Sequence, residues 1–247
     1  MQIALVGATG FVGSKILSEA VARGHFVTAI CRHPENVKQD DRVRAVYADV
    51  ADTPSLTREF RTQDAVIHSY TPPSDPHAHA FVAAALQAGD HSLETIASYV
   101  PPDPAAYDAH VKGRIEAQKA GTQSIIQAAK SAGIRRILAV GGAATLLVGG
   151  VRLIDGPDFP KVFEGGAKST AVIRDLLEKE DGIDWTVLCP STMIVPGQRT
   201  GKFRLGMDDL LIAADGSSSI SLEDFAVAMI DELENPQHIR RRFTVGY

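Results

Sequence analysis

The sequence predicts an α/β fold of the Rossmann type, a doubly wound parallel sheet with helices on both faces. Three observations predict it: short apolar runs alternate with helical segments, a glycine-rich turn follows the first run, and further glycines end the intervening helices. A chain of 247 residues, 45% of them hydrophobic, can bury a large core. We therefore expect a single domain over residues 1–247, with a small substrate-side extension toward the C-terminus.

Six short runs rich in β-branched and other apolar residues have the length of buried strands. They are Gln2–Val6, Phe26–Cys31, Val43–Tyr47, Ala65–His68, Arg136–Val140 and Trp185–Leu188. Between the first two runs apolar residues recur at helical spacing, and Gly24 supplies the left-handed residue that commonly ends a helix. Similar helical segments end at Gly133 and Gly182, each before another run. This repeated βαβ pattern predicts that the strands are parallel.

The last part of the chain carries a helix signal and a strand signal. Ser221 and Asp224 have the spacing of a capping box, which predicts a helix from there to about Glu234. The apolar residues from Phe243 to Val245 predict a last short strand.

One proline-bracketed stretch, residues 72–105, interrupts the regular alternation and forms an insertion after the fourth strand. It contains a predicted helix around Phe81–Ala88. Because ligands bind beyond the carboxyl ends of strands in open α/β sheets, the insertion is either a lid over a substrate site or an interaction arm without a role in the site. His77 and His79 also fall here, but they diverge on a helix and lack a third ligand, so we expect a solvated loop and no metal site.

Composition narrows the class of partner. The net charge of −5 comes from 30 acidic and 25 basic residues without a long block of one sign, which argues against nucleic acid and membrane surfaces. Cys31 and Cys189 are too few for a disulfide framework. The chain opens on a predicted strand, and its most apolar stretch, Ile137–Val151, is too short and glycine-broken for a membrane helix. We expect a cytoplasmic protein that acts on a small molecule. The sequence leaves open whether the protein forms a homodimer.

The strongest local signal is the glycine-rich turn Gly7–Gly13, which directly follows a predicted strand and opens a helix. Gly7 allows a sharp turn, Gly10 lets the main chain approach a pyrophosphate, and Gly13 permits close packing of helix on strand. Unpaired amides at the start of the helix attract the anion. We predict that this turn binds a dinucleotide cofactor through Gly7, Thr9, Gly10, Phe11, Val12 and Gly13.

The ends of the next strands predict which dinucleotide is bound. Arg32 follows the second strand, where a carboxylate would bind the ribose hydroxyls of NAD and an arginine accepts the 2′-phosphate of NADP. This favours NADP(H) over NAD(H), with NAD or dual use as the alternative. Asp49 and Val50 follow the third strand, within reach of the adenine. His68 and Ser69 end the fourth strand, near the middle of the cofactor.

These residues resemble a known family, the atypical short-chain dehydrogenase/reductases, whose glycine turn is similar to Gly7–Gly13. Four further segments resemble its NADH-flavin reductase-like, NmrA-like group. They are Val140–Ala144, Asp184–Ser191, Pro196–Gly201 and Ile220–Ala226. The resemblance covers nearly the whole chain except the proline-bracketed insertion.

The resemblance implies an NAD(P)-binding Rossmann domain with a substrate-side segment at residues 190–220. It implies that Gly141–Ala144 form a floor of small residues under the nicotinamide, with Gly141 and Gly142 in contact with the cofactor. It also implies that the substrate side of the site is lined by Ala143, Pro190, Ser191 and Thr192.

The sequence departs from the wider family in its catalytic residues. Dehydrogenases of that family pair a tyrosine with a lysine four residues later, and no tyrosine here has that spacing. Glu164 stands in the tyrosine's relation to Lys168, and glycine and alanine replace the usual serine after the fifth strand. The catalytic residues therefore stay unassigned. Lys168 is the one candidate, with an ordinary exposed lysine as the alternative.

Hydride transfer to a flavin, a quinone or a similar conjugated acceptor does not need that proton relay, because the accepting ring delocalises the charge and takes its proton from water. We therefore expect an NAD(P)H-dependent oxidoreductase of this kind, with flavin as a substrate. The alternative is a non-catalytic NADP(H)-binding redox sensor. An NAD-dependent epimerase or dehydratase is a third hypothesis, weakened because those relatives use the same tyrosine and lysine.

Overall fold

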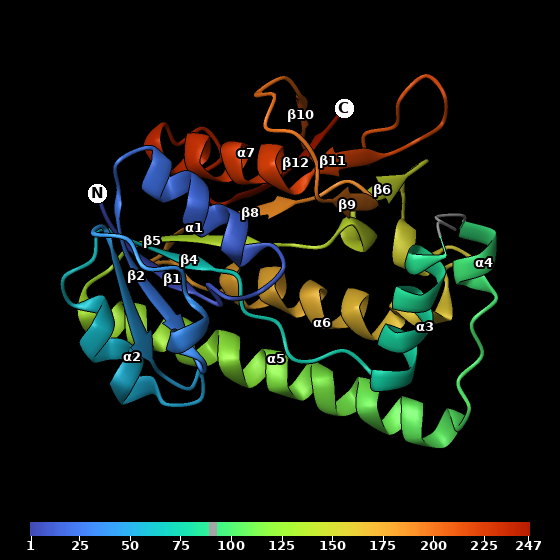
Figure 1. Cartoon of the computed structure of the whole chain (residues 1–247), viewed down its shortest axis with the longest axis horizontal. Helices are drawn as coiled ribbons and strands as arrows, with labels where there is room; N and C mark the ends of the chain where they lie inside the picture. Colours follow the sequence, from blue (N-terminus) through green and yellow to red (C-terminus); the bar gives the residue numbers. More distant parts are fainter. Residues whose placement is uncertain (89–92) are drawn as a thin grey trace.

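The centre of the computed structural model, which describes residues 1–88 and 93–247, is an eight-stranded sheet (Figure 1). Its strands are β1 Gln2–Val6, β2 Phe26–Cys31, β3 Val43–Tyr47, β4 Ala65–His68, β5 Arg136–Val140, β8 Asp184–Cys189, β10 Arg204–Gly206 and β12 Arg241–Gly246. They lie in the order β10, β12, β8, β5, β4, β1, β2, β3, and only β10 runs antiparallel to its neighbour. The order reverses between β1 and β4, which is the switch point at which such sheets bind ligands.

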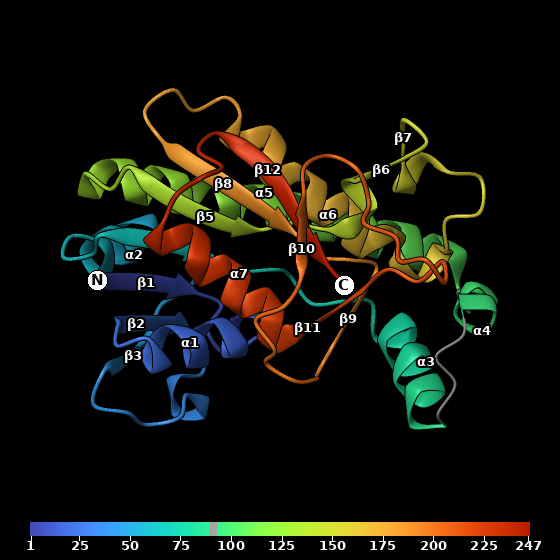
Figure 2. The same cartoon turned by 90° about the horizontal axis from the view of Figure 1, so that it is seen from above.

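Helices cover both faces of this sheet. One face carries α1 Gly13–Ala22 and α7 Leu222–Glu234, and the other carries α2 Thr53–Phe60, α5 Pro104–Ala132 and α6 Lys161–Leu177 (Figures 1 and 2). The predicted fold class is confirmed. Five of the six predicted strands have the predicted bounds, and β8 is longer by one residue at each end.

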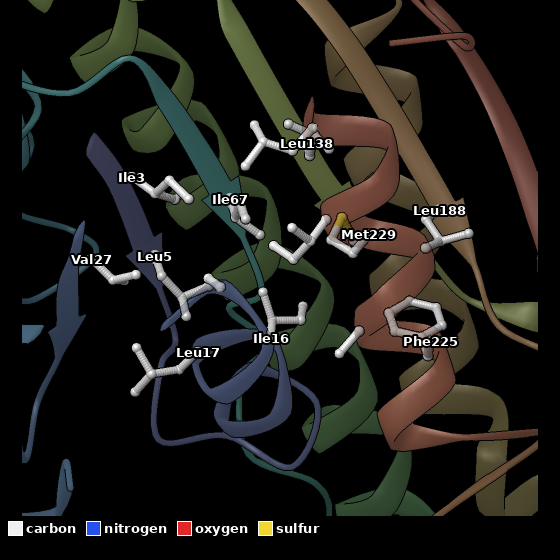
Figure 3. Packing of buried hydrophobic residues seen from close by; sticks show 14 of the residues in the cluster. Ile3, Leu5, Ile16, Leu17, Val27, Ile67, Leu138, Leu188, Phe225 and Met229 are labelled. Carbon is white, nitrogen blue, oxygen red and sulfur yellow. The ribbon is translucent and has the colours of Figure 1, made fainter. Parts of the chain in front are cut away.

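The two helical layers bury two separate apolar clusters, because successive strand residues point to opposite faces. On β1, Ile3 and Leu5 pack toward α1 and α7, where Phe225 and Met229 meet them (Figure 3). The alternate residue Ala4 belongs to the cluster on the other side of the sheet, under α5 and α6.

The insertion after β4 is more helical than predicted. It contains α3 Pro76–Gln87 and α4 Leu93–Ala97, which lie beyond the carboxyl ends of the strands (Figure 2). The prediction started α3 too late, and it placed His77 and His79 in a loop, whereas both are exposed on α3. Residues 89–92 of the predicted insertion lie outside the described residues.

Two aspartate–proline pairs explain the early helix starts. Asp75 precedes α3 and accepts a hydrogen bond from the Ala78 amide at 2.9 Å. Asp103 precedes α5 and accepts one from the Ala106 amide at 3.0 Å. Proline is favourable in the first turn of a helix because its missing N–H would be unpaired there. The prolines therefore open helices here, where the composition alone suggested loops.

Shorter strands complete the carboxyl edge of the sheet. A hairpin pairs β6 Leu147–Val148 with β7 Val151–Arg152. A parallel pair joins β9 Met193–Val195 to β11 Ser219–Ser221, so the two ends of the 190–220 segment lie side by side. The predicted cap of α7 is half formed: the Ser221 hydroxyl accepts from the Asp224 amide at 3.0 Å. The Asp224 carboxylate instead accepts from the main-chain amides of Thr200 and Gly201.

Within residues 1–88 and 93–247, no helix is long and apolar enough to cross a membrane.

Candidate functional site

The glycine-rich turn is packed so closely that side chains cannot replace two of its glycines. Gly7 has φ of 90°, and a Cβ there would lie 2.6 Å from the Ser69 carbonyl oxygen. A Cβ on Gly13 would lie 2.1 Å from the Gly7 carbonyl oxygen. Between them, the Gly10 amide donates to the Gly7 carbonyl at 3.0 Å and closes the turn. The turn thus packs closely against the chain at the end of β4, at the switch point of the sheet.

This turn leaves the start of α1 open to an anion. Val12 occupies the N-cap position and provides no side-chain hydrogen bond to the helix. Thr9, Gly10 and Phe11 are exposed beside it, with Phe11 60% exposed. Uncapped amides and the helix dipole together attract negative charge, and the absence of Cβ atoms lets the main chain approach it. The residues present therefore fit the pyrophosphate of a dinucleotide.

The predicted adenosine-side residues Arg32, Asp49 and Val50 follow β2 and β3, and Tyr70, which the sequence analysis missed, follows β4. Arg32 follows β2 and is exposed, and Asp49 follows β3 and accepts from the Ala51 amide at 2.9 Å. Burial raises the pKa of the Tyr70 phenol, and the charges of Arg32 and Asp49 act on that pKa in opposite directions. The Tyr70 ring fills the space above Gly121 of α5, where a Cβ would lie 2.6 Å from Cε1. Val50 packs on the same glycine.

His68 differs from the other predicted cofactor residues because its side chain is buried. Its Nε2 lies 3.0 Å from the Thr122 hydroxyl on α5, and its Nδ1 lies 3.3 Å from the Tyr70 amide nitrogen. A contact with the cofactor would therefore run through the main chain at this position. The neighbouring Ser69 keeps its predicted location at the switch point, where its amide donates to the Val6 carbonyl.

A buried polar chain, also missed from the sequence, holds this region in place. The Ser169 hydroxyl on α6 donates to Gln118 on α5 at 3.3 Å, and the Gln118 amide donates to the Tyr70 carbonyl at 3.3 Å and to the Thr122 hydroxyl at 3.1 Å. Gln118 and Thr122 are four residues apart, which puts them on one face of the helix. Both are fully buried, so their hydrogen bonds fix the path of the chain after β4.

The buried His68 predicts a loss of stability in mild acid. Burial lowers its pKa from 6.5 to about 4, so the folded state disfavours the proton that the unfolded chain accepts. Stability is therefore full above the unfolded pKa and falls as the pH drops from about 6.5 toward 4. We expect the wild type to lose about 2 kcal/mol more unfolding free energy than His68→Gln between about pH 7 and pH 5 in urea titrations. Equal losses in both proteins would contradict this account.

The predicted nicotinamide floor is squeezed between β8 and α6. A Cβ on Gly141 would lie 2.6 Å from the Cys189 sulfur, and one on Gly142 would lie 2.4 Å from the Thr170 hydroxyl oxygen. Only glycine fits at these two positions without a shift of its neighbours. Ala143 follows at the start of a short 3-10 helix, Ala143–Thr145, and is half-buried.

The predicted substrate-side residues after β8 attach the C-terminal segment to the sheet. Pro190 and Ser191 are buried, and the Ser191 hydroxyl donates to the Val245 carbonyl at 2.9 Å. Thr192 is exposed, and its hydroxyl donates to the Ser218 carbonyl at 2.9 Å. These hydroxyls position the 190–220 segment at the carboxyl edge of the sheet.

Lys168, the candidate catalytic residue, is on the exposed side of α6. Its ammonium group forms an ion pair with Glu164, one turn earlier on the same helix. Glu164 also pairs with Lys161 at 2.8 Å. Burial alone would raise the pKa of Glu164, but the hydrogen bonds from the two lysines outweigh it and lower the pKa. The position that would carry the tyrosine of a proton relay thus holds an ionised carboxylate that cannot donate a proton near neutral pH.

Two surface hollows lie away from these residues. One of about 340 Å³ lies between α7 and β12, with Phe203, Asp231 and His238 in its wall. The other, of about 440 Å³, lies beside β3 and the loop from Pro34 to Asp41. Neither includes the glycine-rich turn, whose fit to a dinucleotide comes from its main-chain geometry.

Known proteins are similar to this chain over most of its length. A family model described as NAD(P)H-binding matches residues 7–236. The uncharacterized protein YwnB of Bacillus subtilis is 34% identical over 251 residues, which cover 99% of this chain and 98% of YwnB.

Two solved structures are also similar over the whole chain. A structure from Bacteroides thetaiotaomicron, described as a candidate epimerase, is 36% identical with a TM-score of 0.79 and covers 100% of this chain and 96% of its own. A Streptococcus pneumoniae structure described as a candidate NADH-flavin reductase is 26% identical with a TM-score of 0.67, and the match covers 100% of this chain and 99% of that one. The family model spans most of the chain and includes the glycine-rich turn. The protein therefore belongs to the NAD(P)H-binding family.

Proposed function

We propose that the protein is an NADPH-dependent reductase whose substrate is a flavin, a quinone or a similar conjugated acceptor. The observation that carries the proposal is a site with a dinucleotide cradle but no proton relay. The cradle is the turn Gly7–Gly13, and the relay position on α6 holds the Glu164–Lys168 ion pair.

The missing general acid limits the acceptor. Reduction of an isolated ketone needs a proton at the forming alkoxide, and a positioned acid contributes about 10²–10⁴-fold to such a reaction. A conjugated ring spreads the incoming charge and takes its proton from solvent. The chain then needs only to hold two rings together, which orientation alone can accelerate.

Each part of the site has a role in this proposal. The uncapped start of α1 binds the pyrophosphate, and Arg32 binds the 2′-phosphate through charge-assisted hydrogen bonds. The chain after β5, where Gly141 and Gly142 pack tightly against β8 and α6, lies beside the nicotinamide, and the 190–220 segment borders the acceptor. When bound, NADPH supplies the hydride.

One solved relative adds support, and another names a different reaction. The Streptococcus structure carries a flavin reductase description, and the Bacteroides structure carries an epimerase description. Epimerases of the wider short-chain dehydrogenase/reductase family use the tyrosine and lysine that this sequence lacks. The reductase is therefore the better supported function for this chain.

The test is a set of acceptors that differ in their need for an acid. Purified protein with NADPH is mixed under anaerobic conditions with FMN, riboflavin, menadione and cyclohexanone, and oxidation of the nicotinamide is followed by absorbance. We expect turnover with at least one conjugated acceptor and none with the ketone. Turnover of the ketone alone would contradict the proposal, and tight NADPH binding with no turnover would favour the redox sensor.

Replacement of Lys168 tests the missing relay directly. Because Lys168 is 46% exposed and paired with Glu164, we expect Lys168→Met to keep kcat/KM for the best conjugated acceptor within about twofold of the wild type. A loss of about 100-fold or more would instead assign the lysine a part in catalysis. Lys179→Met, a lysine just beyond the end of α6, is the matched control for loss of one surface charge.

A further inference from the structure

Arg114 of α5 is a partly buried cation whose hydrogen-bond partners among the described residues are all neutral. Its Nη1 donates to the Ser74 hydroxyl at 3.1 Å and its Nη2 to the Thr71 hydroxyl at 3.2 Å. Its Nε is buried without a partner within residues 1–88 and 93–247. Burial lowers the pKa of the guanidinium.

Other partly buried arginines of this chain have carboxylate partners. Arg136 lies 3.0 Å from Glu232, and Arg23 lies 2.7 Å from Glu19. In the described part of the chain Arg114 forms no such ion pair. Since a desolvated charge is costly unless it is paired, a guanidinium with two hydroxyls and a free Nε has unused capacity for an anion.

The position of Arg114 is close to the predicted nicotinamide floor. Gly166 of α6 flanks the guanidinium, since a Cβ there would lie 3.7 Å from Nη2. Gly166 is one helical turn, about 5.4 Å, from Thr170. Thr170 in turn contacts Gly142 of the floor. On its other side the guanidinium contacts Thr71, two residues after Ser69 at the switch point.

A second unpaired donor or acceptor lies on the same helix face. The His110 Nε2 is buried without a partner in the described residues. It is four residues before Arg114, so the two side chains are neighbours on α5. Glycines at 165 and 166 keep the facing surface of α6 free of side chains beside the guanidinium. The cluster of Arg114 and His110 on α5 with Thr71 and Ser74 of the chain after β4 thus has two buried polar atoms, Arg114 Nε and His110 Nε2, that have no partner in the described residues.

We propose that this cluster is an oxyanion subsite that binds a carboxylate or phosphate group of the acceptor. The guanidinium forms charge-assisted hydrogen bonds to the anion, and the Ser74 and Thr71 hydroxyls turn to donate to it as well. The substrate class is thereby narrowed to anionic conjugated acceptors, oriented with the anion about one helical turn from the reacting ring. This inference rests on the proposed reductase function.

The experiment compares ligands that differ only in the anion. Binding of FMN and riboflavin, which share one ring system, is measured by flavin fluorescence quenching with the cofactor site saturated by NADP⁺. Benzoate and its neutral isostere benzamide are then tested as competitors. The proteins are the wild type, Arg114→Gln, Arg114→Lys, and the matched control Lys112→Gln, which removes an exposed charge from the same helix.

We expect the wild type to prefer the anionic member of at least one pair. Arg114→Gln should lower the affinity for that anionic ligand by about 10- to 100-fold and leave the affinity for its neutral counterpart unchanged. The affinity of Arg114→Lys for the anionic ligand should lie between those of Arg114→Gln and the wild type. Lys112→Gln should bind both ligands like the wild type. A lost FMN preference assigns the site to phosphate, and a lost benzoate preference assigns it to carboxylate. A structural role for Arg114 would weaken both members equally.

Two results would overturn the subsite. One is equal affinity of the wild type for both members of each pair, and the other is a preference that survives in Arg114→Gln. The binding measurement does not depend on turnover. If no acceptor is reduced but FMN or benzoate binding still depends on Arg114, the proposed reductase function fails while the oxyanion subsite stands. If acceptors are reduced with no such dependence, the subsite alone fails.

Discussion

Replacement of Gly13 by alanine is expected to abolish tight binding of NADPH and to lower the stability of the fold. The new Cβ would lie 2.1 Å from the Gly7 carbonyl oxygen, a main-chain atom that can move only if the turn opens. We expect overpacking to lower the free energy of unfolding by about 1–3 kcal/mol. The main-chain amides would no longer be aligned with the pyrophosphate, and this should lower the affinity for NADPH by at least about 100-fold.

Thermal denaturation with and without NADPH measures both effects. A ligand at about 100 times its Kd stabilises the native state by about 2.7 kcal/mol, so the wild type should show a clear rise in Tm. Gly13→Ala, with an affinity at least about 100-fold lower, should gain at most about 0.4 kcal/mol at the same NADPH concentration. The matched control is Gly113→Ala in α5, where a Cβ meets nothing within 4 Å and helix propensity should add about 0.5–1 kcal/mol. An undiminished ligand shift in Gly13→Ala would remove the turn from the cofactor site.

Replacement of Arg32 by alanine is expected to remove the preference for NADPH over NADH. Arg32 is exposed at the end of β2, where its guanidinium can form bidentate bonds to a 2′-phosphate. One or two charge-assisted hydrogen bonds correspond to about 10- to 100-fold in affinity, and we expect this loss for NADPH. The affinity for NADH, which has no phosphate there, should change by less than about threefold.

Titration of both cofactors against both proteins checks this, with Arg61→Ala as the control. Arg61 is also exposed, but it follows α2 and lies near the amino end of β4, away from the switch point. Its replacement should leave both affinities unchanged. If Arg32→Ala weakens NADH as much as NADPH, or if the wild type prefers NADH, the 2′-phosphate is not bound by Arg32.

The sheet was predictable from the sequence because local pattern and tertiary role agree in it. The strands β1, β2, β4 and β5 are largely buried, so each reads as a short apolar run, and the helices α1 and α5 are followed by Gly24 and Gly133 just before the next strand. The glycine-rich turn was predictable for the same reason: the conformation of Gly7 and the close approach at Gly13 restrict these positions to one residue type.

The parts that the sequence did not reveal depend on contacts between distant segments. Arg114 and Gln118 read as ordinary helix residues until α5 is placed under the chain that follows β4. Tyr70 packs against α5 only because Gly121 leaves room for its ring. Proline-rich composition also hid the helix starts at Pro76 and Pro104, where an aspartate cap decides the local structure.

The most direct test of the proposed function is an anaerobic single-turnover reaction between protein-bound NADPH and its best conjugated acceptor. NADPH carries deuterium on one or the other face of the reactive ring carbon, and both nicotinamide oxidation and acceptor reduction are recorded. We predict equal rates for the two signals and a slower reaction with only one of the two deuterated forms, because a fixed cofactor transfers hydride from one face. Bound NADPH that no acceptor oxidises, or oxidation that the protein does not accelerate, would contradict the account.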